Sequence, residues 1–298
     1  MRHYVTLFDS NYLVKGLLML RSLQRVSRGP YEVTVIALDE RVASLKSANA
    51  VFVPYAALET AVTALREVRR IRTRREWCWS LASAALRWRM TQVEPNEIVT
   101  YLDSDLGFYS DPEACFGELG DRSIGIVPHR FAAEYESYID TSGEFNVSLV
   151  SLRNDEVGRR CAEVWTQQVL ENCSESDCGD QRYLDAWPTE YGDHLCVFGS
   201  PGIGVAPWNV FGYEVTTAPA GVTANGHPVV FYHYHELVDA LGKAPPTTMP
   251  ETVGGARYLD GFRLTLGYPL RAVDIDTFYR SYCRDYRNLE DTFWMPPC

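Results

Sequence analysis

Short apolar segments alternate with amphipathic ones along this chain, and the alternation restricts the possible folds more than any other feature. Residues 3–8 and 31–38 have the composition of buried strands, and residues 12–23 between them have apolar side chains near helical spacing. Further strands are predicted at 51–54, 98–102, 123–127, 145–152 and 229–235, and helices at 56–70, 76–90 and 155–173. This order is typical of an α/β protein with a mainly parallel sheet covered on both faces.

Two carboxylates directly follow the buried strand at 98–102. Asp103 and Asp105 are separated by Ser104, and Asp9 follows the first strand in the same way. Ligands of such sheets bind at the carboxyl ends of the strands, where these side chains fall. Paired carboxylates suit Mn²⁺ or Mg²⁺, which keep coordination positions free for water and phosphate. A solvated turn can carry the same pattern, but the buried strand before it favours a metal site.

Two histidines lie in the last predicted strand of the α/β region. Because side chains alternate along a strand, His233 and His235 share one face. Taken alone, such histidines are more often structural, because this face also suits aromatic packing against Tyr232 and Tyr234; the metal interpretation gains support only from the distant pair of carboxylates.

Acidic residues outnumber basic ones, 39 to 28, which gives a formal net charge of -11. Nucleic acid is therefore excluded as the main partner, since phosphate backbones select basic surfaces. The local exception is a basic run that is interpreted in three ways: a solvated helix face, a loop over a pyrophosphate, or an edge that meets an anionic acceptor or a membrane. It contains Arg66, Arg69, Arg70, Arg72, Arg74 and Arg75.

The chain has no apolar stretch near the roughly 20 residues of a membrane span, and its first residues do not resemble a signal peptide. Its eight cysteines are scattered, which favours reduced thiols. We therefore expect a cytoplasmic protein; a homo-oligomer is left open.

The segment from Ile98 to Phe108 resembles the D-x-D motif of GT-A glycosyltransferases, and four other segments resemble theirs in the same order. The resemblance covers most of residues 1–240 and is nearest to glycosyltransferase family 8. It implies a Rossmann-like nucleotide-diphospho-sugar transferase fold with a mixed, mainly parallel sheet. The implied domains are a catalytic domain at 1–243 and a partly helical appendage at 244–298.

The resemblance also implies roles for individual residues. The first strand and its loop resemble the segment that holds the nucleotide, which assigns Thr6, Phe8, Asp9 and Tyr12 to the donor, with Ser104 beside them. Asp103, Asp105 and His233 would bind the metal ion. Three further residues lie in segments similar to the "F-N-x-G" strand and the "D-Q" element, and they would face the transferred sugar: Asn146, Asp180 and Gln181.

Two departures separate the chain from family 8. Ser148 stands where relatives often have glycine. After His233, the family's glycine and Lys-Pro-Trp run is replaced by Tyr234-His235-Glu236-Leu237, so the lysine that clamps the diphosphate is missing. Its place could be taken by His235, Lys243 or the basic run.

Together these features predict a metal-dependent glycosyltransferase. It would move a sugar from a nucleotide diphosphate donor, with UDP expected, to an acceptor glycan or small molecule, with retention of configuration. Two alternatives remain open at this point: a nucleotidyltransferase, and a non-catalytic sugar-binding protein on the same fold. The first usually has a glycine-rich loop after its first strand, which this chain lacks.

Overall fold

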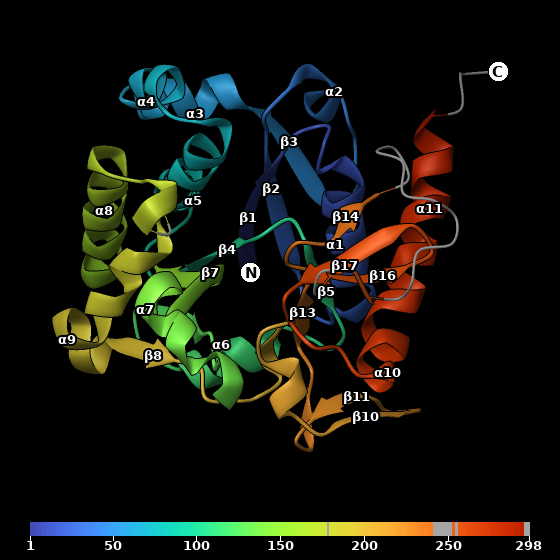
Figure 1. Cartoon of the computed structure of the whole chain (residues 1–298). Coiled ribbons are helices and arrows are strands. Elements are labelled where there is room, and N and C mark those ends of the chain that lie inside the picture. Colours follow the sequence, from blue (N-terminus) through green and yellow to red (C-terminus); the bar gives the residue numbers. More distant parts are fainter. Residues whose placement is uncertain (178, 241–251, 254–255, 295–298) are drawn as a thin grey trace.

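A seven-stranded sheet forms the centre of the protein, and helices cover both of its faces (Figure 1). The computed structural model describes residues 1–177, 179–240, 252–253 and 256–294. Along the sheet the strands follow the order β3-β2-β1-β4-β7-β6-β8. They span Arg2–Phe8 (β1), Tyr31–Ala37 (β2), Ala50–Pro54 (β3), Ile98–Leu102 (β4), Ile124–Pro128 (β6), Phe145–Arg153 (β7) and Leu195–Val197 (β8).

The sheet is mixed but mainly parallel, which confirms the expectation from the sequence. Strands β1 to β4 run parallel, β7 runs antiparallel to both β4 and β6, and β8 is parallel to β6. Because β7 is reversed, its first residues lie at the edge where β1 and β4 end. A hydrogen bond from the Asp103 amide to the Ser148 carbonyl, 2.9 Å long, marks this junction. This edge collects side chains from strands that are distant in sequence.

Successive side chains of a strand point to opposite faces of the sheet, and each face has its own hydrophobic core. On β1, Val5 and Leu7 face the layer of α5 (Arg74–Met90) and α8 (Glu156–Glu171). Tyr4 and Phe8 face the opposite layer, which includes α1 (Leu13–Val26) and α6 (Glu113–Leu119). Burial of each such side chain stabilises the fold by roughly 1.5–3 kcal/mol. The two layers therefore hold the sheet from both sides.

Two small sheets extend the molecule beyond the main one. The first has the order β5-β13-β9 and consists of Leu106–Phe108 (β5), Phe231–His233 (β13) and Ile203–Val205 (β9). The second contains Val215–Ala218 (β10), Gly221–Ala224 (β11) and His227–Pro228 (β12). Only the first borders the edge where β1 and β4 end.

The C-terminal part packs against α1. It has a sheet ordered β14-β17-β16-β15, followed by helical segments. Phe278 and Tyr282 share a buried cluster with Val14 and Leu18 of α1. The position of the expected domain boundary, residue 244, lies outside the described residues, so the boundary stays a prediction. The elements are Val238–Asp239 (β14), Thr252–Val253 (β15), Ala256–Leu259 (β16), Phe262–Leu266 (β17), Ala272–Asp274 (α10), a π-helical turn Ile275–Tyr279 and Arg280–Trp294 (α11).

Two elements differ from the sequence prediction. The helix expected at 56–70 is divided into α3 (Tyr55–Ala61) and α4 (Leu65–Ile71), because Val62 adopts the non-helical angles φ -125° and ψ 80°. The strand expected at 229–235 is limited to β13, and the chain turns at Glu236, which has a positive φ of 59°. The other short helices are Glu40–Ala43 (α2), Ile139–Ser142 (α7) and Trp187–Tyr191 (α9). Among the described residues, no helix is both long and apolar enough to pass through a membrane.

Candidate functional site

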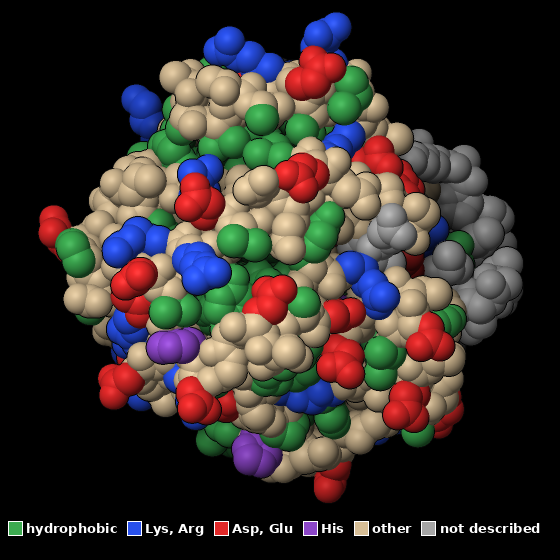
Figure 2. Space-filling model, turned by 90° about the vertical axis from the view of Figure 1, so that its left-hand side faces the viewer, with side chains coloured by type: hydrophobic (Ala, Val, Ile, Leu, Met, Phe, Trp, Pro, Cys, Tyr) green, Lys and Arg blue, Asp and Glu red, His purple; other side chains and the backbone are tan. Residues whose placement is uncertain are grey.

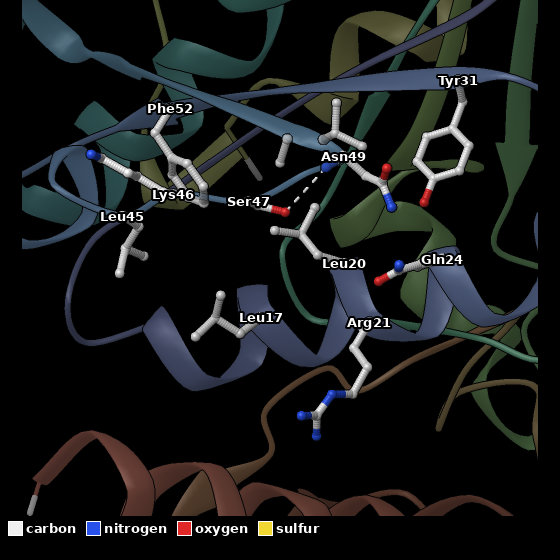
Figure 3. Close-up of a pocket in the computed structure, with 12 residues that line it drawn as sticks. Leu17, Leu20, Arg21, Gln24, Tyr31, Leu45, Lys46, Ser47, Asn49 and Phe52 are labelled. Carbon is white, nitrogen blue, oxygen red and sulfur yellow. Dashed lines mark hydrogen bonds between the residues drawn. The ribbon is translucent and has the colours of Figure 1, made fainter.

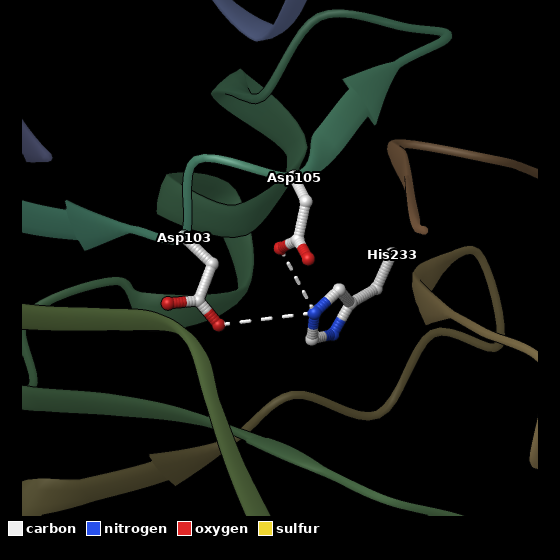
Figure 4. Close-up of side chains that lie close together, drawn as sticks. All are labelled: Asp103, Asp105 and His233. Carbon is white, nitrogen blue, oxygen red and sulfur yellow. Dashed lines mark ion pairs between the residues drawn. The ribbon is translucent and has the colours of Figure 1, made fainter. Parts of the chain in front are cut away.

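Two carboxylates and an imidazole meet at the carboxyl edge of the main sheet (Figure 4). The Nε2 atom of His233 lies 3.2 Å from a carboxylate oxygen of Asp105 and 3.9 Å from one of Asp103. One potential ligand atom from each of the three side chains lies within 4.8 Å of the others. The structure thus brings together the three residues that the sequence assigned to a metal ion.

Pairing of two short strands places the histidine beside the carboxylates. β13 runs antiparallel to β5, with His233 opposite Leu106, the residue that follows Asp105. The amide of Tyr234 then donates a 2.9 Å hydrogen bond to the Asp105 carbonyl. Close contact at this point requires a glycine in β5, because a Cβ atom on Gly107 would lie 2.7 Å from the Tyr234 ring. Backbone register therefore fixes the site.

Burial and mutual charge shift the pKa values of all three groups. Burial raises the pKa of Asp103, His233 opposes this, and repulsion by Asp105 adds to it, with a net shift above the usual range. Burial also acts to raise the pKa of Asp105, but attraction to His233 outweighs it and the pKa lies below the usual range. For His233, burial lowers the pKa, but attraction to both carboxylates prevails and the pKa is raised.

This donor set fits a divalent cation. Two carboxylate oxygens from the turn between β4 and β5 and one imidazole nitrogen from β13 lie close together, and oxygen ligands of this kind suit Mn²⁺ or Mg²⁺. Binding of a cation would also replace the protons that these raised pKa values favour on Asp103 and His233. The coordinating atom of the histidine would be Nε2, the ring atom that faces the carboxylates.

Two neighbours of the site were missed by sequence reasoning. The hydroxyl of Tyr101 donates a 3.0 Å hydrogen bond to Asp103. The ammonium of Lys15 lies 3.9 Å from Asp105 and 4.6 Å from the centre of the Tyr12 ring, although only 8% of Lys15 is exposed. A signal was present: Lys15 belongs to the buried stripe of α1, with Leu18, Met19 and Ser22 at helical spacing.

Lys15 leads to the first prediction. Lys15→Met keeps most of the apolar stem but removes a positive charge that would repel a cation bound by Asp105. We therefore expect Mn²⁺ to bind about tenfold more tightly to this variant than to wild type when no nucleotide is present. Titration calorimetry measures this affinity. Arg21→Met on the exposed side of α1 is the matched control and should leave it unchanged. Weaker binding by Lys15→Met would instead make Lys15 a support that orients Asp105.

The three residues expected to face a transferred sugar lie beside the carboxylates, and two of them belong to one hydrogen-bond network. The Asn146 amide nitrogen lies 3.3 Å from both Gln181 Oε1 and His129 Nε2, and Asn146 Oδ1 accepts a 2.9 Å hydrogen bond from the Ser148 amide. Gln181 in turn donates to the Ser142 carbonyl at 2.7 Å. Both donor hydrogens of Asn146 are therefore engaged, as in a satisfied core amide, and its role toward a sugar stays a prediction.

His129 completes this network as a neutral ring. Burial lowers the pKa of His129 to about 3. Its Nδ1 then donates to the Gly143 carbonyl at 2.9 Å, and its Nε2 accepts from Asn146; these partners assign the tautomer. The sequence offered no period or motif for this contact, because it joins residues of three different segments.

Asp180 is buried and is held through its backbone carbonyl. Its carbonyl accepts a 3.0 Å hydrogen bond from the Trp165 indole, and the whole residue is 5% exposed. Burial, and after it the charge of Asp103, raise the pKa of Asp180 well above the usual range. Burial and the charge of Asp103 therefore both oppose ionisation of this carboxyl.

The residues assigned to the nucleotide divide into interior and accessible ones. Thr6 and Phe8 are buried in β1, and the Phe8 ring packs against Gly16, where a Cβ atom would be 2.5 Å from it. Any contact from these two to a nucleotide would thus use the backbone. Tyr12, by contrast, is 45% exposed and its ring lies over Lys15. Asp9 pairs with Arg74.

The loop after β1 depends on Asp9. Its carboxylate accepts hydrogen bonds from the Asn11 amide at 2.9 Å and the Tyr12 amide at 3.2 Å. Ser104 and His235 lie beside the metal-site candidates: Ser104 separates the two carboxylates, and the His235 ring is 5.6 Å from that of His233. Donor binding by this group of residues stays a prediction.

The basic run has several structural partners. Arg72 donates to the carbonyls of Val169 at 2.7 Å and Leu170 at 2.6 Å, which caps the C-terminal end of α8. Arg66 and Arg70 have side chains that are 63% and 77% exposed, and α4 carries both near the top of Figure 1. Figure 2 shows Lys and Arg side chains along the upper edge of the adjoining face. Contacts of the run with a pyrophosphate or an anionic surface stay predictions, and Lys243 lies outside the described residues.

A separate groove of about 310 Å³ lies between α1 and strands β2 and β3 (Figure 3). Leu17, Leu20 and Phe52 form apolar walls, and Arg21 and Lys46 belong to its lining. None of the residues assigned to the site lines it. It borders Tyr31 at the start of β2, whereas the metal-site candidates follow the end of β4.

Comparisons by sequence find two similar proteins in Bacillus subtilis (strain 168). The uncharacterized protein YfnF is 29% identical over 247 residues, which cover 78% of this chain and 80% of that protein. The uncharacterized protein YfnD is 29% identical over 243 residues, with coverage of 78% and 76%. No protein-family model matches the chain.

Comparisons by structure find solved glycosyltransferases. Mouse xyloside xylosyltransferase 1 aligns with a TM-score of 0.52 and 17% identity over 79% of this chain and 98% of that chain. The galactosyltransferase LgtC, solved with donor and acceptor sugar analogues, aligns with a TM-score of 0.51 and 17% identity over 99% and 97%. At this identity the similarity establishes the fold alone. The chain has the GT-A fold.

Proposed function

We propose that this protein is a metal-dependent glycosyltransferase that moves a sugar from a nucleoside diphosphate sugar to a glycan or small-molecule acceptor. The observation that carries the proposal is the meeting of Asp103, Asp105 and His233 at the carboxyl edge of a GT-A sheet. The sugar transfer named for both structural neighbours supports the same reaction class.

Each group of side chains has a task in this proposal. Asp103, Asp105 and His233 hold the cation, and a bound Mn²⁺ or Mg²⁺ supplies Lewis-acid neutralisation of the diphosphate leaving group. Lys15 lies beside Asp105; burial lowers the pKa of Lys15 and attraction to Asp105 opposes this, and in its protonated form the side chain adds positive charge where the diphosphate would lie. It thus stands as the replacement for the clamping lysine that the sequence lacks.

The sugar side of the reaction rests on other residues. Asp180 lies near enough to Asp103 to respond to its charge, which suits a group beneath the transferred sugar. Gln181 has one amide hydrogen beyond its contact with Ser142 and can donate it to a sugar hydroxyl. We assign UDP as the nucleotide and retention as the outcome from the resemblance to family 8, to which we propose the chain is related.

A thermal-shift experiment gives the second prediction. Mn²⁺ and UDP should stabilise the protein more together than either alone, because each completes the other's coordination. At 100 times the dissociation constant the expected gain is about 2.7 kcal/mol, or roughly 5 °C in melting temperature. The absence of any shift with metal and a panel of nucleoside diphosphates would favour a non-catalytic protein on this fold.

Donor turnover tests the proposal directly. A panel of nucleotide sugars is incubated with the protein and Mn²⁺, and release of the nucleoside diphosphate is measured with and without EDTA. We expect release from at least one UDP-sugar that stops when EDTA is added. Release of inorganic pyrophosphate instead, in the presence of a nucleoside triphosphate and a sugar phosphate, would identify a nucleotidyltransferase. The configuration of the transferred sugar, read by NMR, then decides between retention and inversion.

A further inference from the structure

Four aromatic side chains from two distant segments form a continuous group, which we call the aromatic platform: Phe131, Tyr135, Tyr138 and Tyr268. The ring centres of Tyr135 and Tyr138 are 5.7 Å apart, and Tyr268 lies 5.2 Å and 6.1 Å from them. Tyr138 is 42% exposed, and the other three rings are half-buried. The platform is thus an aromatic surface that is open to ligands.

The platform is joined to the metal-site candidates through one tryptophan. The Trp208 ring lies 5.3 Å from each of the rings of His233 and His235. On its other side it lies 6.4 Å from Phe131 and 6.5 Å from Tyr268. A molecule on the platform would therefore lie next to the place where the donor sugar leaves its diphosphate.

Backbone conformation and hydrogen bonds hold the segments that carry these rings. Arg130 has a positive φ of 49°, and its guanidinium donates to the carbonyls of Ile203 at 2.8 Å and of Phe198. A non-glycine residue holds this conformation only when its surroundings enforce it, and such residues gather at functional sites. The hydroxyl of Tyr135 donates to the Gly267 carbonyl at 3.2 Å, which ties the two segments together.

Charge around the platform restricts what can bind. The segment 132–142 carries Glu134, Glu136 and Asp140 and has no lysine or arginine. Burial, then Tyr138, then Glu236 raise the pKa of Tyr268, so Glu236 also lies near the platform. The Arg182 guanidinium donates a 3.1 Å hydrogen bond to the Ile139 carbonyl, and its charge is paired with Asp185 at 3.2 Å. The remaining carboxylates near the rings repel an anionic ligand and accept hydrogen bonds from hydroxyl groups.

We propose that the aromatic platform is the acceptor subsite and that it binds a neutral saccharide, with the apolar C–H face of a sugar ring against Tyr138 and Tyr268. Rigid, amphipathic tyrosines offer contact area at low entropic cost, and the flanking carboxylates accept hydrogen bonds from the sugar hydroxyls. The role of the bound saccharide as acceptor rests on the proposed function. Binding of the saccharide itself does not depend on it.

The test measures saccharide binding without nucleotide or metal. A glycan array with neutral and uronic- or sialic-acid-containing members selects a probe, and calorimetry gives its dissociation constant for four proteins: wild type, Tyr138→Ala, Tyr138→Phe and Phe211→Ala. Phe211 is the matched control because it is 38% exposed and contacts Arg271 outside the platform. We expect a neutral glycan to bind, Tyr138→Ala to weaken it about tenfold, and the other two variants to match wild type.

Three results would overturn the inference: preference for anionic glycans, no glycan bound by wild type, or equal affinity of wild type and Tyr138→Ala. The melting temperature with Mn²⁺ and UDP should be the same for wild type and Tyr138→Ala, which separates this site from the donor site. A protein that binds the glycan through Tyr138 but turns over no nucleotide sugar would contradict the proposed function and leave the saccharide site standing.

Discussion

Asp103→Asn is expected to lower Mn²⁺-dependent donor turnover about 1000-fold and to leave the fold intact. The carboxylate is one of three metal-ligand candidates, and loss of several kcal/mol of charge stabilisation corresponds to a rate effect of this size. Burial, together with repulsion by Asp105, outweighs the attraction of Asp103 to His233 and raises the pKa of Asp103, so its neutralisation should leave the metal-free protein as stable as wild type or slightly more stable. Turnover is measured with Mn²⁺ in excess, and stability is measured by melting in EDTA.

Asp105→Asn is the informative partner variant. It should lose turnover to the same degree, but it also removes the pairing of Asp105 with His233 and Lys15, so the metal-free protein should lose about 1–3 kcal/mol. If both variants lose the same activity but only Asp105→Asn is destabilised, then both carboxylates serve the reaction and Asp105 alone also stabilises the metal-free protein. Wild-type turnover in either variant would show that the metal site lies elsewhere.

Trp165→Ala is expected to have the largest effect on stability, about 3–5 kcal/mol. The Trp165 side chain is fully buried in α8, its ring lies 5.5 Å from that of Trp187, and its indole donates to the Asp180 carbonyl. Urea unfolding monitored by circular dichroism measures the loss. A loss under 1 kcal/mol would show that the surrounding core collapses around the cavity.

Trp165→Phe separates packing from the hydrogen bond. It keeps most of the buried ring but leaves the Asp180 carbonyl without the indole donor, so we expect a loss of about 1–2 kcal/mol. If Asp180 has the proposed role, donor turnover should fall in this variant even where the protein is fully folded. Unchanged turnover would separate Asp180 from the reaction.

Most strands and long helices of the main sheet region are predictable from a continuous apolar run or from helical spacing, although the seven-residue helix α6 was not predicted. Strand β4, for example, is entirely buried and was found at its true boundaries, 98–102. The three-residue strand β5 could not be predicted, since three residues define no period. Yet β5 is the element that pairs with β13 and places His233 beside Asp105. The ligand set came from the resemblance, and its geometry came from a pairing that the sequence does not reveal.

Other features depended on contacts between distant segments. The break in the helix expected at 56–70 arises at Val62, whose neighbours in the sequence carry no proline or glycine to signal it. The His129–Asn146–Gln181 network and the position of Trp208 between the histidines and the platform join residues from several loops. No local sequence pattern predicts such contacts, because the partners are distant in the sequence and the residues next to each of them carry no signal of the pairing.

The pairing of β5 with β13 also sets when the site can exist during synthesis of the chain. The strands are separated by more than a hundred residues, and the proposed ligand group is incomplete until both have joined. A growing chain that has emerged only as far as the main sheet would hold Asp103 and Asp105 but not His233. Chains that end before residue 233 lack one of the three proposed ligands, so we expect them to hold the proposed cation more weakly than the whole chain does.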